Sequence, residues 1–309
     1  MINLYNKYLK LKRNNFDSQF LLSTSGIVKA YYGINKDGYY RLSFLSSKET
    51  KIKGDTKNIG ITYGNSSENN YWTCFDLKNE SLLSVFCTFG EDLVSCVLDE
   101  KDEDKAISKL RSRFSTWLTL FKKTRSPLSI EQAKGLYGEL YFIDNYLFDI
   151  YGEYKTINGW SGPENYSKDF SIDNTWFEIK TANVLSPTIK ISSIQQLSSE
   201  NEGKLIVVRI EDMSDAYIGS NSSINELCVS ILARISDINI KDIFLEKISD
   251  AGYDFSDEIG DRKFHVEKME KYVVNDKFPI LRENDLSEKA INNVSYDLII
   301  RMLDDYKEE

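Results

Sequence analysis

Residues 169–181 read DFSIDNTWFEIKT and predict a tight β-hairpin that carries several charged side chains. Short apolar runs flank Asp173-Asn174, and both of these residues tolerate the positive φ of a two-residue hairpin turn. A turn at this pair places Asp169 opposite Glu178 on the neighbouring strand, with Cβ atoms roughly 4.5–5.5 Å apart. The hairpin therefore brings two negative charges together.

Lys180 follows Glu178 by two residues and so points to the same face of its strand, whereas Phe177 and Ile179 point to the opposite face. Like charges placed opposite each other destabilise a hairpin and invite a shared proton or a bound cation. Mg²⁺ prefers one or two carboxylates together with waters and substrate phosphates. A lysine beside such an ion can orient or deprotonate a water, so the arrangement fits metal-assisted phosphodiester hydrolysis.

Aspartate, glutamate and lysine are also common on ordinary surface hairpins, so their spacing alone does not separate a site from a solvated turn. The preceding segment favours a site. Residues 129–149 predict a helix, which begins with a capping box of Ser129 and Gln132. Glu139 lies on or beside its apolar stripe, and a carboxylate there is costly unless it meets a donor or a cation.

Two glycines interrupt the same predicted helix. Gly135 and Gly138 each cost roughly 1 kcal/mol relative to alanine in a helix interior. We therefore expect another backbone to pack closely against both.

The segments after the hairpin alternate in type. A strand is predicted at 187–193 (PTIKISS), a helix or turn follows at 193–200, and 204–211 (KLIVVRIE) reads as a buried strand. Residues 222–250 read as helical. The remaining tail, 264–309, mixes short helices with three predicted strands, FHVEKMEKYVV, FPILREN and VSYDLII.

The first hundred residues read as a β-rich domain, built from short aromatic or β-branched runs between turn residues. The runs are AYYGIN, YYRLSFLS, NIGITYG, NYWTCFDL, LLSVFCTFG and LVSCVLDE. Residues 99–123 predict a helix. We accordingly expect a β-rich domain at 1–100, a central core at 101–220, and a mixed α/β region at 221–309 packed on that core.

Positive charge is concentrated just before the central segment, although the chain carries a net charge of −9. Between residues 105 and 130 there is no acidic residue, and a local basic surface can bind phosphates on an acidic protein. The cations of this run are Lys105, Lys109, Arg111, Arg113, Lys122, Lys123 and Arg125. The run can also be an ordinary solvated helix face.

Composition narrows the classes of protein to which the chain can belong. The 309 residues, 41% of them hydrophobic, suit two or three folded units. No stretch reaches the roughly 18 apolar residues of a membrane span, and no signal peptide is recognisable, so we expect a cytoplasmic protein. The single histidine, His265, argues against a zinc site or a Ser/His/Asp triad. The four cysteines lack CxxC spacing, and no Walker A or GxGxxG motif occurs.

The order helix, hairpin, strand, helix, strand resembles the PD-(D/E)XK nuclease superfamily. GLYGEL supplies Glu139, KDF supplies Asp169, and FEIKT supplies Glu178 and Lys180. ISSIQQL and YVVNDKFPIL resemble elements of a subgroup of bacterial PD-(D/E)XK proteins that is linked to restriction and phage defence. One departure is Lys168, which stands before Asp169 where many members have proline.

The resemblance implies an α+β or α/β fold, with a restriction-endonuclease-like core of helix, three-stranded meander, helix and strand beside the N-terminal β-rich domain. It implies a Mg²⁺-dependent DNA endonuclease, of a type II-like restriction or anti-phage kind, in which Mn²⁺ substitutes for Mg²⁺. The expected metal ligands are the side chains of Asp169, Glu178 and Glu139 and the carbonyl of Ile179. Glu139 would act through a water or at a second ion.

In the same scheme Lys180 positions or activates the attacking water. Gln196 is expected in the catalytic set, and Ser193 at the rim or on a phosphate. Double-stranded DNA is the expected substrate, contacted by the basic run from Lys109 to Arg125. Cleavage of both strands usually needs two active sites, so we expect a C2 homodimer, with other defence-system proteins as further candidate partners.

Two other functions stay open from the sequence. A nucleic-acid-binding or scaffolding subunit can keep this fold without turnover inside a larger complex. A repair or RNA-processing nuclease would use the same chemistry on another substrate.

Overall fold

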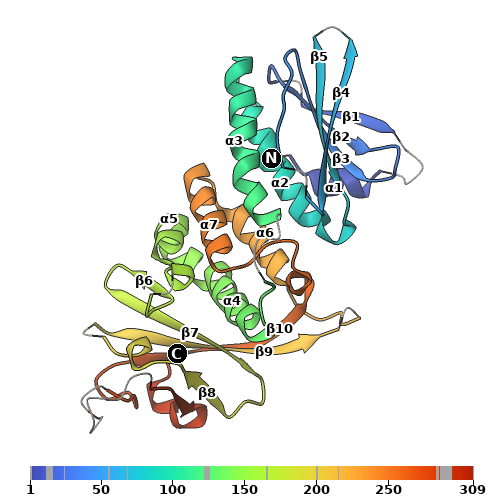
Figure 1. The fold of residues 1–309 in the computed structure, drawn as a ribbon. Helices are drawn as coiled ribbons and strands as arrows, with labels where there is room; N and C mark the ends of the chain where they lie inside the picture. Colours follow the sequence, from blue (N-terminus) through green and yellow to red (C-terminus); the bar gives the residue numbers. More distant parts are fainter. Residues whose placement is uncertain are drawn as a thin grey trace. The chain divides into compact units, whose positions relative to one another are not determined.

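The computed structural model describes residues 2–11, 17–23, 25–54, 56–67, 69–121, 126–164, 166–199, 201–214, 216–282, 285 and 294–308. The chain is mixed α+β (Figure 1) and divides into two compact units. The first unit is Met1–Ser126 with Tyr253–Asp257, and the second is Pro127–Gly252 with Glu258–Glu309.

The first unit contains a five-stranded antiparallel sheet in the order β1-β2-β3-β5-β4 (Figure 1). Its strands are β1 (Ser18–Ser23), β2 (Lys29–Ile34), β3 (Tyr40–Ser46), β4 (Ile59–Ser67) and β5 (Asn70–Leu77). Its helices are α1 (Leu4–Leu9), the short η1 (Glu80–Leu82), α2 (Leu83–Val97) and α3 (Glu103–Phe121). The four runs predicted between residues 30 and 77 are strands, and α3 belongs to this unit.

The last two predicted strands of the N-terminal region are wrong, because α2 occupies their place. Its buried residues include Phe86, Phe89, Leu93 and Val97, which recur at the three- and four-residue spacing of a helix face. Aromatic and β-branched content suggested strands, but the spacing of the apolar residues determines which face is buried. The region before residue 100 is therefore a sheet with a long helix.

The second unit is built on a four-stranded sheet in the order β10-β9-β7-β6. Its strands are β6 (Phe170–Ile172), β7 (Thr175–Asn183), β9 (Gly203–Met213) and β10 (Lys263–Val274). The strands β6 and β7 form the hairpin, and β7 runs parallel to β9. The helices of this unit are α4 (Ile130–Phe142), the π-helical η2 (Ile143–Leu147), α5 (Phe148–Gly159), α6 (Ile224–Arg234) and α7 (Ile238–Asp250).

The predicted three-stranded meander is not formed. Strand β8 (Thr188–Ile191) leaves the main sheet and pairs with β11 (Tyr296–Ile299) in a separate two-stranded sheet. The segment between β8 and β9, predicted as a helix or turn, contains the short 3₁₀ turn η4 (Ile194–Gln196), so the second helix of the expected core is not formed there. The described part of FPILREN, residues 278–282, contains no strand.

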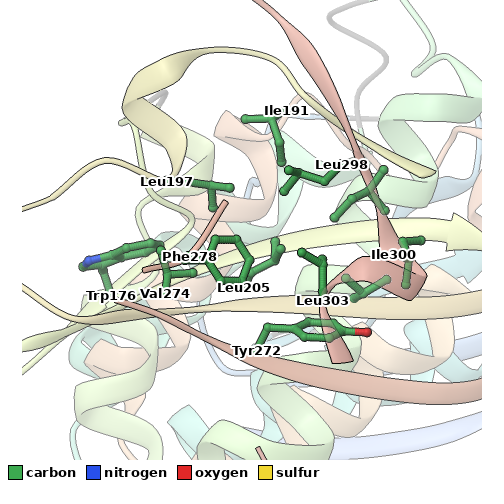
Figure 2. Packing of buried hydrophobic residues seen from close by; sticks show 12 residues of the cluster. Trp176, Ile191, Leu197, Leu205, Tyr272, Val274, Phe278, Leu298, Ile300 and Leu303 are labelled. Carbon is green, nitrogen blue, oxygen red and sulfur yellow. The ribbon is translucent and has the colours of Figure 1, made fainter. Parts of the chain in front are cut away.

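A hydrophobic cluster joins this second small sheet to the main sheet of the unit. Figure 2 shows Trp176 of β7, Leu205 of β9 and Tyr272 of β10 packed with Ile191 and Leu298. The side chains that complete the labelled cluster are Leu197, Val274, Phe278, Ile300 and Leu303. The cluster explains why β8 and β11 pair with each other, since each contributes an apolar face to the same core.

Helix α4 packs against β7 through Gly138. A methyl group at Gly138 would lie 2.1 Å from Thr181 Oγ1 and 3.5 Å from Ile179 Cγ2. Gly138 is therefore closely packed as expected, but against side chains of β7 and not against another backbone. The expectation is wrong for Gly135, where an added methyl group meets nothing within 4 Å.

Candidate active site

The hairpin adopts the register that the turn predicts. Phe170 lies opposite Phe177 and Ile172 opposite Thr175, and Asp173 has the positive φ of 53° that the turn requires. Glu178 and Lys180 consequently share one face of β7.

Lys180 Nζ lies 2.7 Å from Glu178 Oε1, a contact that is an ion pair when Glu178 is ionised. Glu178 is only 1% exposed, and Lys180 is mostly enclosed.

Asp169 reaches β7 by its side chain. The pairing of β6 with β7 ends at Phe170, so the expected direct pairing of Asp169 with Glu178 is not formed. The Ile179 N–H donates to Asp169 Oδ2 at 2.6 Å. The carboxylate of Asp169 thereby takes the place of the next strand residue at this sheet edge.

Glu139 comes from α4 and lies beside the same carboxylates. The indole N–H of Trp160 donates to Glu139 Oε2 at 2.6 Å. A methyl group built on Gly162 would lie 2.6 Å from Glu139 Oε2 and 3.3 Å from Asp169 Oδ1. These two carboxylate oxygens therefore both border the space that a side chain at residue 162 would take.

Gln196 also belongs to this group of side chains, because it contacts Lys180. Its Oε1 accepts hydrogen bonds from Lys180 Nζ at 3.0 Å and from the Ser192 N–H at 2.8 Å. The amide thus links the ammonium group of Lys180 to the end of β8.

Lys168 fixes the turn that carries Gln196. Its ammonium group donates to the carbonyls of Gln195, Gln196 and Ser198 at 2.6, 2.7 and 3.0 Å. The same group lies 4.0 Å from the ring centroid of Trp176, a cation–π contact. The residue that departs from the superfamily pattern is therefore a structural anchor of the site.

The site places several acidic groups in a poorly solvated space. Burial, followed by the charge of Asp169, raises the pKa of Glu178 to about 8 although Lys180 opposes the shift. Enclosure by protein, followed by the charge of Asp169, raises the pKa of Glu139 well above its usual value. Burial also raises the pKa of Asp169, against the hydrogen bond from the Ile179 N–H. A cation would stabilise the ionised forms of all three.

The second carboxylate oxygen of Glu178 indicates whether a metal ion would fit this site. Glu178 Oε2 is buried and has no hydrogen-bond partner among the described residues. A buried carboxylate oxygen without a donor is costly, and a hard cation would satisfy it. In the described parts of the chain, no three acidic, cysteine or histidine side chains are grouped closely enough to hold a metal by themselves. An ion at this place would need ligands besides carboxylates, such as waters or a backbone carbonyl.

The predicted DNA contacts fall into different environments. Lys109 and Arg111 lie on the exposed face of α3 in the first unit, and Lys109 Nζ lies 2.7 Å from Glu100 Oε2. Arg113 is 5% exposed and forms a buried ion pair with Asp92, so it is not available to DNA. Its place on the buried side of α3 explains the error. Ser193 is half-buried beside η4. Lys122, Lys123 and Arg125 lie outside the described residues.

Sequence reasoning missed Trp160, Gly162 and the anchoring role of Lys168. Each acts through partners far from it in sequence: Trp160 meets Glu139, and Lys168 meets the turn at Gln195–Ser198. The only signal is local, the run WSGP at residues 160–163 between α5 and the hairpin, whose small residues permit close approach. Such a run does not identify its partners.

The mixed α+β fold and the side chains around β7 are consistent with the PD-(D/E)XK class. The family model described as "Putative PD-(D/E)XK family member, (DUF4420)" matches residues 5–301, and the chain belongs to that family. Membership indicates a nuclease-like protein, and PD-(D/E)XK nucleases usually use divalent metals. No curated protein and no solved structure gives a significant match. In the described residues, no helix is both long enough and apolar enough to cross a membrane.

Proposed function

We propose that the protein is a Mg²⁺-dependent DNA endonuclease, of a type II-like restriction or anti-phage kind, in which Mn²⁺ substitutes for Mg²⁺. The observation that carries the proposal is Glu178 Oε2, a buried oxygen that lacks a hydrogen-bond partner in the described residues. It belongs to a carboxylate that already pairs with Lys180 and lies near Asp169. A hard cation would supply the partner that this buried oxygen lacks.

Asp169 and Glu178 would hold the ion with their side chains, and Ile179 would add its carbonyl. The hydrogen bond from the Ile179 N–H to Asp169 Oδ2 orients that carboxylate. When bound, the ion polarises the phosphodiester and stabilises the charge that develops on its oxygens. Glu139 would bind through a water or at a second ion.

Lys180 would position or activate the attacking water. An ammonium group has three donors, and among the described residues Glu178 and Gln196 accept two of them. The third can donate to a water or a phosphate oxygen. Gln196 holds the lysine in place. Ser193 would line the rim of the site or contact a phosphate.

The substrate in this proposal is double-stranded DNA, contacted by Lys109 and Arg111 on α3 and by the later cations of the basic run. A C2 homodimer would supply one active site for each strand. The proposal places the enzyme in the cytoplasm, where other defence-system proteins are possible partners.

The test is nicking of supercoiled plasmid in Mg²⁺, with Lys180→Ala compared with wild type. We expect Lys180→Ala to lose at least about 100-fold in cleavage rate, the usual scale of a general acid–base contribution. Lys155→Ala is the control, because Lys155 lies 2.8 Å from Asp173 at the tip of the same hairpin and is 52% exposed. The control should cleave like wild type.

Equal rates for wild type and Lys180→Ala would contradict the proposal. Absence of cleavage in wild type, with DNA binding retained, would favour the non-catalytic subunit instead. Cleavage of RNA in preference to DNA would favour the repair or RNA-processing class. A run with EDTA separates metal-dependent cleavage from contaminating activity.

A further inference from the structure

Glu139 is held by a residue that comes from neither of the strands of the hairpin. Trp160 is 0% exposed, and its indole N–H donates to Glu139 Oε2 at 2.6 Å. Its ring stacks on Phe170 with centroids 6.4 Å apart and packs on Phe244 of α7 at 6.0 Å. These ring contacts leave the indole in one orientation, with its donor toward α4.

The backbone around Trp160 is fixed from two sides. The N–H groups of Ser161 and Gly162 both donate to the carbonyl oxygen of Asp169, at 2.8 and 3.0 Å. On the other side, the buried Lys247 donates to the carbonyl of Trp160 and to Glu164. The segment from Trp160 to Gly162 therefore connects Glu139 of α4 to Asp169 at the start of the hairpin.

Gly162 keeps open the space between the two carboxylates. An added methyl group would lie 2.6 Å from Glu139 Oε2, and carbon and oxygen do not approach so closely without a shift. It would also lie 3.3 Å from Asp169 Oδ1. Glycine is thus the residue that lets both oxygens face the same volume.

From this geometry we propose that Trp160 is a positioning residue for the metal site: it orients the Glu139 carboxylate toward Asp169, while Gly162 leaves room between them. The inference rests on the proposed function in one respect, namely that a divalent ion binds beside Asp169 and Glu178. Groups that orient ligands without touching the metal typically change metal affinity by 10–100-fold when removed.

If Trp160 only stabilised the fold, it would make the same hydrogen bond. The test therefore compares Trp160 with a second buried tryptophan whose indole also donates to a carboxylate. Trp117 is 1% exposed, and its indole N–H also donates to a carboxylate oxygen, Asp92 Oδ2, at 2.6 Å. Both Asp92 and Trp117 belong to the first unit. Trp160→Phe and Trp117→Phe each remove one buried indole donor, but only Trp160 is bonded to a residue of the proposed site.

The measurement is Mn²⁺ affinity of the full-length protein by titration calorimetry, alongside the melting temperature without metal. We expect the two variants to lose comparable stability. We expect Trp160→Phe to bind Mn²⁺ at least about 10-fold more weakly than wild type, and Trp117→Phe to bind it with unchanged affinity. Gly162→Ala should also weaken Mn²⁺ binding.

A double-mutant cycle asks whether Trp160 acts through Glu139. In a Glu139→Gln background, Trp160→Phe should have little further effect on Mn²⁺ affinity, since the group it orients is already changed. Independent, additive effects would overturn the proposal. If Trp160→Phe does not fold, 3-benzothienylalanine at position 160 replaces it, because this residue keeps the shape and lacks the N–H.

The outcomes separate the two proposals. Wild type that binds Mn²⁺ but does not cleave DNA contradicts the proposed function and leaves the positioning role measurable. Equal Mn²⁺ affinities for Trp160→Phe and Trp117→Phe, in a wild type that binds the ion, overturn the positioning role alone. A wild type that does not bind Mn²⁺ overturns both.

Discussion

Glu178 combines burial with a charge that the surrounding protein does not fully stabilise. Lys180 satisfies one of its oxygens, and the other oxygen is left without a donor in the described structure. Burial raises its pKa to about 8, because the protonated form is easier to bury than the ionised form. The proposed metal site would trade stability of the metal-free protein for metal affinity.

The pKa of Glu178 predicts how the stability of the metal-free protein depends on pH. Between its usual pKa of 4.5 and its folded value of about 8, folded Glu178 holds a proton that the unfolded chain has released. The free energy of unfolding should therefore fall as pH rises through this window and level off above it. Glu178→Gln has no such titration, so its stability should fall less between about pH 6 and pH 8.5.

Urea unfolding in EDTA at the two pH values measures this difference. Glu131→Gln, at an exposed position in the first turn of α4, is the control and should follow wild type. Added Mg²⁺ should stabilise wild type more at the higher pH, since the ion binds the ionised carboxylate. Parallel pH dependence in wild type and Glu178→Gln would show that burial does not hold the proton on Glu178.

The sequence identifies this group of residues only in part. Asp169, Glu178 and Lys180 follow from counting across a two-residue turn, because strand periodicity and hairpin register relate near neighbours by a fixed rule. Trp160 cannot be found in this way. It meets Glu139 because α4, the loop after α5 and the hairpin converge in the tertiary structure.

At the scale of elements, α4 contains two glycines with opposite surroundings. Gly138 faces β7 across a contact that leaves no space for a methyl group, whereas Gly135 faces open space. The same helix carries Glu139 into the site, so the depth at which α4 packs on β7 helps to set where that carboxylate lies.

Alanine substitutions at these two glycines should change stability in opposite directions. Gly138→Ala must displace Thr181 or move α4, and overpacking of this kind costs typically about 1–3 kcal/mol. Gly135→Ala should stabilise the protein by roughly 0.5–1 kcal/mol, because alanine favours the helix and nothing is displaced. Urea denaturation of both variants gives the two free energies.

The comparison contains its own control, since the substitutions are identical and lie three residues apart on one helix. Mg²⁺-dependent cleavage should fall in Gly138→Ala and stay at the wild-type rate in Gly135→Ala. A stabilising effect of Gly138→Ala would mean that α4 does not pack on β7 as the structure has it.

Elements differ in how far the sequence determines them. The β6–β7 hairpin is predictable, because its turn residues and its apolar alternation agree. Helix α2 is misread, because its aromatic residues suit either type of element and only their spacing identifies a helix. The pairing of β8 with β11 depends on a strand about a hundred residues further on, and no local pattern specifies such a partner.

At the scale of the whole molecule, the described exposed cations of the predicted DNA-binding run and the carboxylates of the candidate site belong to different units. Lys109 and Arg111 lie on α3 of the first unit, whereas Asp169, Glu178 and Lys180 belong to the second. Composition alone would suggest weak affinity for DNA, given the net charge of −9. A local cluster of positive charge can bind phosphates on a protein that is acidic overall.

This division predicts that DNA affinity and metal affinity can be changed separately. Lys109→Ala combined with Arg111→Ala should raise the Kd for DNA and reduce its salt dependence, by about one unit of log–log slope for each phosphate that the protein no longer neutralises. Mn²⁺ affinity should be unchanged. Fluorescence anisotropy with labelled duplex DNA at several salt concentrations, in Ca²⁺ to prevent cleavage, measures both the Kd and the slope.

The control is the pair Lys48→Ala and Lys51→Ala, which removes two exposed lysines from the same unit at positions outside α3. Each double variant removes two positive charges, so any general electrostatic effect appears in both. Lys180→Ala provides the converse case, since it should abolish turnover with DNA affinity largely retained. If the α3 variant and the control have the same Kd and the same salt slope, α3 does not contact DNA and the first unit serves another purpose.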